Sequence, residues 1–161
     1  MFGGNFRGIA EKMEYLASLG VTLIYLNPVF ESYSNHKYDT ANYAVTDSDF
    51  GTLKDFALMI AQAEKYGIKV MLDGVFSHTG SDSIYFNKNG RFGVLGAFNS
   101  PDSPYREWYN FQEYPDKYDC WWGIKTLPNI NENNASFCNY ICGDDGVIAR
   151  YMNCLLYTSP S

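Results

Sequence analysis

The fold is decided by two stretches, NFRGIAEKMEYLASLGVTLIYL (residues 5–26) and TLKDFALMIAQAEKYGIKVML (residues 52–72). In each, apolar residues recur at the spacing of one helical face, a single glycine ends the helix, and a continuous apolar run follows. Asn5 predicts the N-cap of the first helix, and Thr52 with Asp55 predicts a capping box at the second. Helix, glycine and strand therefore occur twice in the same order. Strands that are apolar on both faces and joined through helices are typical of a parallel sheet with right-handed crossovers.

The links between these elements are asymmetric. Each helix reaches its strand through one glycine, Gly20 or Gly67, whereas residues 27–51 form a long polar link from strand to helix. Barrels built from alternating strands and helices carry their active sites at the C-terminal ends of the strands. We therefore expect the functional residues on the side of the long links.

Composition and charge exclude several classes of protein. The chain has 161 residues and a formal net charge of −6, which gives it no electrostatic reason to approach nucleic acid or an anionic membrane. Its apolar runs are shorter than the roughly 20 residues that a membrane-spanning helix needs. The first residues lack a basic region followed by an apolar core, so we expect a cytoplasmic protein. The four cysteines form no C-x-x-C pair, which argues against a disulfide scaffold or a zinc knuckle.

Polar residues gather just beyond each predicted strand, and both histidines of the chain are among them. Residues 35–39 (NHKYD) follow the first strand, and residues 73–78 (DGVFSH) follow the second. The ends of parallel strands meet at one edge of a sheet, so the two groups are expected to converge on one ligand. Each residue alone could be structural. Two His and two Asp could also bind zinc, but no H-E-x-x-H motif or i, i+4 His pair occurs.

Aromatic residues make up 17% of the chain, and residues 79–145 contain all three tryptophans without a clean helical or strand period. We interpret this segment as an inserted subdomain. Its aromatic side chains are expected mostly to fill a small core, with a minority left as a stacking surface for a ligand. The core candidates are Phe86, Phe92, Phe98, Trp108, Phe111 and Trp121.

Several ordered motifs together resemble glycoside hydrolase family 13, the α-amylase family, and most closely its neopullulanase and cyclomaltodextrinase group. The resemblance extends from Phe2 to about Asn153. The motifs are FGGNFRGI (2–9), IYLNPVFE (24–31), HKYDT (36–40), DGVFSHTG (73–80) and LPNIN (127–131).

The resemblance implies an α/β fold, part of a (β/α)8 barrel with an inserted irregular domain B. The two strands then correspond to the second and third of the barrel. We expect the N-terminal part of the catalytic barrel in residues 1–78, domain B in residues 79–145, and the start of the next barrel helix in residues 146–153. Residues 154–161 (CLLYTSPS) break the helical period and match a translated sequencing adapter, so we expect a non-native read-through tail.

The resemblance also assigns substrate-binding residues. His36 and Tyr38 resemble the pair that lines subsite −1, with the tyrosine ring stacked on the sugar, and His78 resembles the histidine that hydrogen-bonds the same glucose unit. Asp73 resembles the aspartate that orders the site. A sugar has an apolar C–H face and a rim of hydroxyls, which suit an aromatic ring beside polar side chains. We expect all four residues at one rim of the sheet.

No cofactor is expected for the chemistry, although the resemblance leaves room for a structural Ca²⁺ in the longer protein. Asn5 stands where some family members have a calcium-binding aspartate. Ser77 departs from the usual asparagine that helps to hold calcium, which counts against a site there.

The expected function is that of a fragment of a retaining α-glucan hydrolase acting on α-1,4 bonds of maltodextrins, cyclodextrins or pullulan, with α-1,6 bonds as a second candidate target. The family's nucleophile, acid/base and third carboxylate would lie beyond the C-terminus, so the chain should contain no catalytic residue and be inactive. The expected partner is an α-glucan, without nucleic acid or membrane, and the longer protein could be a homodimer. The alternatives are a non-hydrolytic carbohydrate-binding relative and a transglycosidase.

Overall fold

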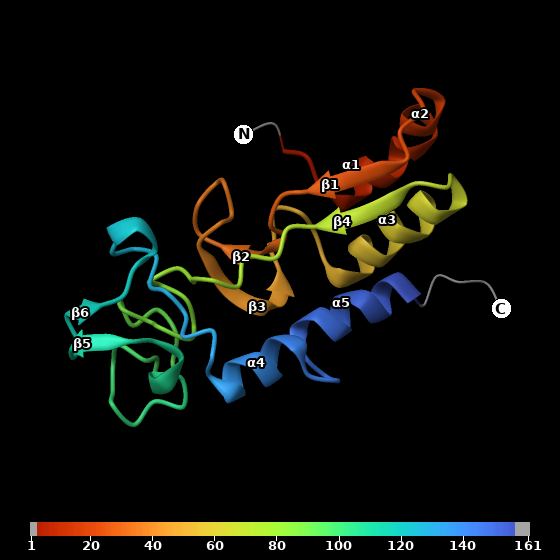
Figure 1. Cartoon of the computed structure of the whole chain (residues 1–161). Helices are drawn as coiled ribbons and strands as arrows, with labels where there is room; N and C mark the ends of the chain where they lie inside the picture. Colours follow the sequence, from red (N-terminus) through yellow and green to blue (C-terminus); the bar gives the residue numbers. More distant parts are fainter. Residues whose placement is uncertain (1–2, 157–161) are drawn as a thin grey trace.

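A computed structural model describes the backbone of residues 3–156 and the side chains of residues 3–153. Two strands and their helices lie at one end, a β-hairpin lies in the middle, and an irregular lobe lies at the other end (Figure 1). The elements are α1 (Phe6–Glu11), α2 (Met13–Ser18), β1 (Leu23–Leu26), β2 (Phe30–Ser32), β3 (Thr40–Thr46), α3 (Leu53–Lys65), β4 (Lys69–Leu72), η1 (Arg106–Trp108), β5 (Phe111–Glu113), β6 (Lys117–Tyr118), η2 (Trp121–Gly123), α4 (Ala135–Cys142) and α5 (Val147–Leu156).

The repeated helix–glycine–strand pattern forms a parallel pair, as predicted. Strands β1 and β4 are hydrogen-bonded in parallel from Leu23 opposite Lys69 to Leu26 opposite Leu72. The Asn5 side chain accepts a hydrogen bond from the amide of Gly8, and the capping box at Thr52 is complete. The first predicted helix is divided at Lys12, whose amide bonds to the carbonyl of Ile9 in a tighter turn.

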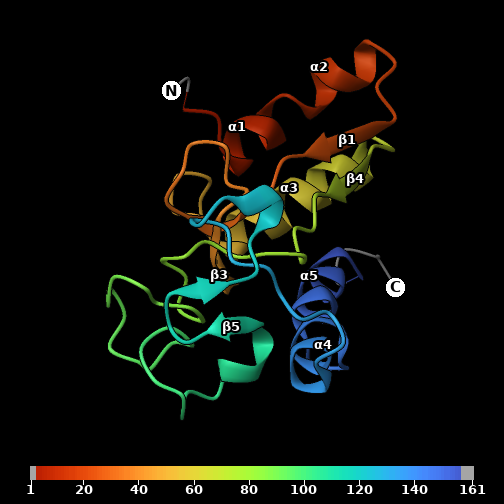
Figure 2. The ribbon, with the colours of Figure 1, turned by 60° about the vertical axis from the view of Figure 1, so that its left-hand side comes forward.

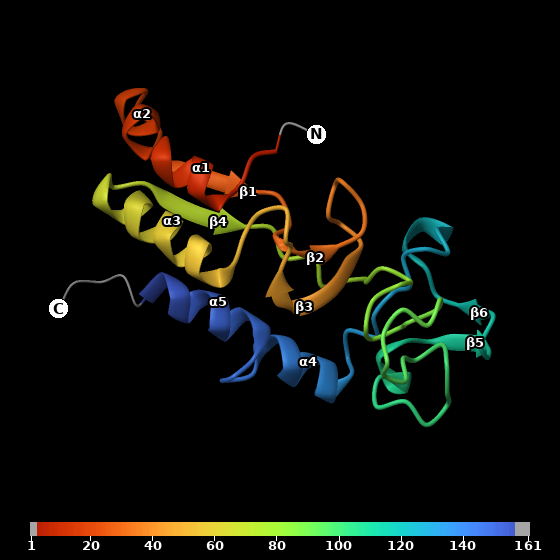
Figure 3. The same cartoon turned by 180° about the vertical axis from the view of Figure 1, so that it is seen from behind.

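One face of the β1–β4 pair is covered by helices and the other is open. Helices α1 and α3 lie against the same side of the pair, as the view from behind shows (Figure 3). Leu23, Tyr25 and Met71 on the opposite face are 45%, 55% and 49% exposed. Within residues 3–156, no layer covers this face. In a closed barrel the corresponding face points inward.

The long link between β1 and α3 contains a β-hairpin that the sequence pattern did not predict. Strands β2 and β3 pair antiparallel with two shifts of register. Ala41 and Tyr43 of β3 are fully buried, and Tyr43 packs edge-to-face on Phe30 of β2. Tyr151 of α5 contacts Phe30 and Phe56, which joins the hairpin, α3 and α5 in one aromatic core.

The lobe formed by residues 79–134 extends away from the β1–β4 pair (Figure 2), and its buried side chains continue the core of the rest of the described chain through Tyr85, which stacks on Tyr43. Phe86 and Trp108 are buried, as expected, and Phe92, Phe98 and Phe111 are partly buried. Trp121 is 40% exposed, so among these candidates it belongs to the minority that does not fill the core. It lies in a short turn at the surface of the lobe and not between packed elements.

Helix α4 lies within residues 79–145, where the sequence shows no clean helical period. Its N-cap is Asn134, which accepts from the amide of Phe137. Helix α5 begins at Val147 and its backbone is described to Leu156. Residues 154–156 of the expected read-through tail continue the backbone of α5, and residues 157–161 lie outside the described residues. The non-native origin of the tail stays a prediction. No helix within residues 3–156 is long and apolar enough to cross a membrane.

Candidate functional site

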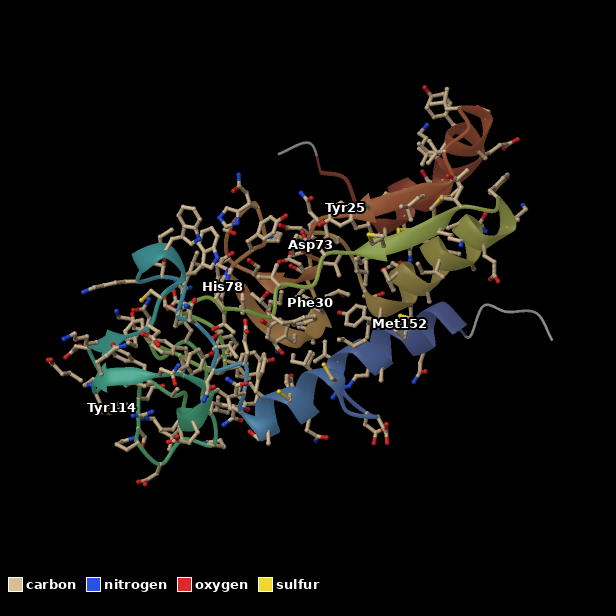
Figure 4. All side chains as sticks on the ribbon, viewed as in Figure 1. Tyr25, Phe30, Asp73, His78, Tyr114 and Met152 are labelled. Atoms are coloured by element: carbon tan, nitrogen blue, oxygen red, sulfur yellow. The ribbon has the colours of Figure 1, made fainter. Side chains whose placement is uncertain are left out.

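The four candidate residues come from two segments that meet at the C-terminal edge of the β1–β4 pair. Asp73 directly follows β4, and its amide donates to the carbonyl of Leu26 at the end of β1 (3.2 Å). His36 and Tyr38 lie in the connection between β2 and β3, and His78 lies a few residues beyond Asp73. Figure 4 shows the Asp73 and His78 side chains on the segment that leads from β4 into the lobe, with Tyr25 beside Asp73.

The carboxylate of Asp73 joins two tyrosines. The hydroxyls of Tyr25 and Tyr38 donate to the same oxygen, Oδ2, at 2.6 and 2.8 Å. These hydrogen bonds favour the neutral phenols, which raises the pKa of Tyr25 to about 12 and raises that of Tyr38. Sequence reasoning missed Tyr25. Strand alternation contained the signal, because Tyr25 lies opposite Met71 and Asp73 follows two residues later on the same face.

His36 and Tyr38 are held together by the residue between them. Lys37 has φ 66°, a left-handed conformation, and its side chain is buried. Its ammonium group lies 2.8 Å from Asp47 Oδ2 and 3.1 Å from Asp49 Oδ2. Burial opposes the charge, but the hydrogen bonds to both carboxylates prevail and raise the pKa of Lys37. The buried Lys37 side chain holds the backbone in place, while His36 and Tyr38 on either side of it are exposed. The Tyr38 amide donates to His36 Nδ1 (3.1 Å).

Asp39 supports the same connection from the other side. Its carboxylate accepts from the hydroxyls of Ser32 and Ser34, and from the Ser34 amide at 3.2 Å. Asp39 and Asp47 are therefore both engaged in holding the backbone of the β2–β3 hairpin in place.

His78 is buried beneath the Tyr38 backbone. Its Nε2 lies 3.0 Å from the carbonyl oxygen of Tyr38, so Nε2 carries the proton, and Nδ1 lies 3.1 Å from the hydroxyl of Ser77. Burial lowers the pKa of His78, which keeps the imidazole neutral at pH 7. The ring also lies 5.5 Å from that of Trp121. His78 thus braces Tyr38 in this arrangement, and its direct contact with a sugar stays a prediction.

The structure brings all four residues into one connected group. Tyr38 is at its centre, since it contacts His36, Asp73 and His78. A surface groove of about 490 Å³ begins beside His36 and Asp39 and extends to Ile124, Thr126 and Leu127 in the lobe. The group offers a partly exposed phenol ring, an exposed imidazole and a carboxylate, which together suit a neutral polyhydroxyl ligand better than a metal or an anion.

The arrangement of the described side chains does not support a metal site. Among residues 3–153, no group of three or more His, Cys, Asp or Glu side chains is arranged to hold a metal ion, so the zinc alternative gains no support. The Asn5 side-chain oxygen is engaged by the Gly8 amide at 2.8 Å as the cap of α1. A structural Ca²⁺ in the longer protein stays a prediction.

Comparison with known proteins gives one consistent result. The family model "Alpha amylase, catalytic domain" matches residues 2–139. An amylopullulanase of Thermoanaerobacterium saccharolyticum is 46% identical over 93% of this chain, which covers 13% of that protein. An intracellular maltogenic amylase of Bacillus subtilis is 36% identical over 87% of this chain and 23% of its own length. Neopullulanase 2 of Thermoactinomyces vulgaris is 38% identical over 71% of this chain and 18% of its own length.

Comparison with solved structures also finds glucan-hydrolysing enzymes that resemble this chain. The cyclic α-maltosyl-(1→6)-maltose hydrolase of Arthrobacter globiformis in complex with maltose superposes with a TM-score of 0.83 at 28% identity. The match covers 96% of this chain and 34% of that one. The chain thus spans less than a quarter of the length of the three curated relatives described above.

Proposed function

Because the chain belongs to the α-amylase catalytic-domain family, as its motifs predicted, we propose that it is part of the barrel of a retaining α-glucan hydrolase. The substrates proposed are maltodextrins, cyclodextrins or pullulan, with α-1,4 bonds as the principal target and α-1,6 bonds as a second. The names of the amylopullulanase, maltogenic amylase and neopullulanase relatives support this range. The intracellular relative also supports a cytoplasmic location for the enzyme.

The observation that carries the proposal is the group centred on Tyr38. Its ring is 37% exposed and can stack on the C–H face of a glucose unit. Asp73 Oδ2 accepts from the hydroxyls of Tyr25 and Tyr38 and thereby fixes the tilt of the Tyr38 ring. The other carboxylate oxygen, Oδ1, can then accept a hydrogen bond from a sugar hydroxyl. His36 is exposed beside the ring and can exchange hydrogen bonds with a second hydroxyl.

The carboxylates near this site are engaged in structural roles. Retaining hydrolysis needs a nucleophilic carboxylate and a carboxylic acid about 5 Å apart on either side of the bond. Asp39 is bound by two serines, Asp47 by Lys37, and Asp73 by two tyrosines. We therefore assign the hydrolytic pair to other parts of the enzyme, and the chain to sugar binding. We assign residues 1–78 to the barrel and residues 79–145 to the inserted domain.

Isothermal titration of the 161-residue chain with maltose and maltotriose tests this function. We expect saturable binding, and a loss of about 5- to 150-fold in Tyr38→Ala, the range for one stacking aromatic. Tyr38→Phe should lose less because it keeps the ring. Tyr15→Ala is the matched control, since Tyr15 is a tyrosine 60% exposed on α2.

An assay for new reducing ends completes the test. The chain should release none from maltotriose above a mock-purified control. Hydrolysis by the chain would place a catalytic pair within it, and equal losses in Tyr38→Ala and Tyr38→Phe would assign the role to the hydroxyl. Absence of binding to any α-glucan would contradict the proposal.

A further inference from the structure

Tyr25 is the member of the hydrogen-bonded group around Asp73 that lies on a strand. It is on β1, opposite Met71 of β4, and is 55% exposed on the open face of the pair (Figure 4). A tyrosine hydroxyl this exposed could be satisfied by water, yet this one donates to Asp73 Oδ2 at 2.6 Å. Because the acceptor is a carboxylate, the hydrogen bond is of the stronger, charge-assisted kind.

The residues of this group differ in how firmly their backbones are held. Tyr25 lies within four consecutive residue pairs that join β1 to β4 in parallel. The Asp73 amide donates to the carbonyl of Leu26, the residue that follows Tyr25 (3.2 Å). Tyr38 lies outside the regular strands, in the connection between β2 and β3. The shared carboxylate oxygen therefore joins this connection to the parallel pair.

Two donors on one oxygen restrict the Asp73 side chain more than one donor does. The terminal torsion of an aspartate has a broad range of allowed angles, so a carboxylate held by Tyr38 alone could still turn. The hydroxyls of Tyr25 and Tyr38 reach Oδ2 from different elements, at 2.6 and 2.8 Å. Turning the carboxylate would lengthen at least one of these bonds. Tyr25 thus keeps Oδ2 at the place where the Tyr38 hydroxyl binds it.

The chemistry of Tyr25 suits a supporting role better than a reactive one. The hydrogen bond to Asp73 raises the pKa of Tyr25 to about 12, so the phenol is neutral at pH 7. A phenol must lose its proton to act as a nucleophile or a base. The single hydroxyl proton of Tyr25 is already donated to Asp73 and is not free for a sugar oxygen.

Resting on the proposed function, we propose that Tyr25 is a positioning residue, which holds Asp73 so that the Tyr38 ring is oriented for a glucose unit before the sugar binds. A ring fixed in advance lowers the entropic cost of binding. This role depends on the Tyr25 hydroxyl and not on its ring. A tyrosine that stacks on the sugar would instead keep most of its effect as phenylalanine.

Titration calorimetry of the 161-residue chain with maltotriose measures the effect on binding. Tyr25→Phe removes one oxygen atom from an exposed side chain, so circular dichroism should be unchanged. We expect the affinity to fall about 2- to 12-fold, the equivalent of one net hydrogen bond, and Tyr25→Ala to show the same loss. Tyr15→Phe is the matched control, because it removes the hydroxyl of a tyrosine that is 60% exposed on α2, and should change nothing.

A second measurement follows the Tyr38 ring itself, in the absence of sugar. The chain is labelled with ¹³C at the tyrosine rings, and NMR relaxation gives the order parameter of the Tyr38 ring. This order parameter should fall in Tyr25→Phe and stay unchanged in Tyr15→Phe. In an Asp73→Ala background, which lacks the acceptor, Tyr25→Phe should cause no further fall in order parameter or affinity.

The outcomes separate this inference from the proposed function. An unchanged order parameter or an unchanged maltotriose affinity in Tyr25→Phe, with weaker binding in Tyr38→Ala, overturns the positioning role and leaves the function intact. A larger loss of affinity in Tyr25→Ala than in Tyr25→Phe also overturns it, because the ring would then act directly. Failure of the original chain to bind maltotriose overturns the proposed function, and the order parameter then decides separately whether Tyr25 holds Tyr38.

Discussion

Replacing Lys37 with methionine should strongly lower the free energy of unfolding, because the charged group of Lys37 is buried against a carboxylate. The variant keeps an unbranched side chain as far as Cε, with sulfur in place of Cδ, and removes the ammonium group. Lys37 and Asp47 have side chains that are 6% and 5% exposed, and their charged atoms are 2.8 Å apart. Asp47 would then stay buried with hydrogen bonds from the amides of Ser32 and Asp49 but without its cation.

The expected loss of unfolding free energy follows from the burial of Lys37 and Asp47. Removing one partner of a buried ion pair costs about 3 to 5 kcal/mol, because the other charge is left uncompensated. The second partner, Asp49, is 50% exposed and adds no more than about 1 kcal/mol. We expect Lys37→Met to lose about 3 to 6 kcal/mol of unfolding free energy. The double variant with Asp47→Asn should lose much less than the sum of the two single losses.

Urea unfolding followed by circular dichroism measures these losses. Lys117→Met is the matched control, because its ion pair with Glu113 is exposed at 62% and 77% and should be worth less than about 1 kcal/mol. A Lys37→Met loss equal to that of the control, or strict additivity in the double variant, would refute the reasoning. Maltose affinity should also fall in Lys37→Met, since Lys37 holds the exposed residues on either side of it.

Two further predictions concern the titration of the site and the packing of the lobe. In Asp73→Asn the pKa of Tyr25 should fall from about 12 toward 10, detected as earlier phenolate absorbance at 295 nm. Because the folded-state pKa is raised, the stabilisation from this hydrogen bond is complete below about pH 10 and is lost as the pH rises toward 12; an unchanged titration curve would contradict the assignment. Gly96→Ala should cost about 1 to 3 kcal/mol in urea unfolding, since a β-carbon there would lie 2.5 Å from the Phe86 carbonyl oxygen. Gly93→Ala meets no atom within 4 Å and should be nearly neutral, so equal effects would refute the packing argument.

Local sequence signals were sufficient to predict the parallel pairing of β1 and β4. Gly20 and Gly67 both have positive φ and end their helices directly before β1 and β4, so pattern and structure coincide. The family motifs also singled out the four residues that the structure joins through Tyr38, and their role in sugar binding stays a prediction.

Features that depend on distant partners could not be read from the pattern. Burial of Lys37 depends on Asp47, ten residues away across a hairpin with irregular register. The exposure of Trp121 depends on a turn closed by Leu127 and on its bonds to the segment after His78. Aromatic composition alone does not distinguish a core side chain from one presented to a ligand.

The most direct test of the proposed sugar site uses the histidines, because the chain contains two and both contact Tyr38. The chain, labelled with ¹⁵N at the imidazole rings, is titrated with maltotriose and followed by NMR. The account predicts that the signals of His36 and His78 shift together and saturate with one dissociation constant, which increases in Tyr38→Ala. Histidine signals that stay unchanged while maltotriose binds elsewhere on the chain would contradict it.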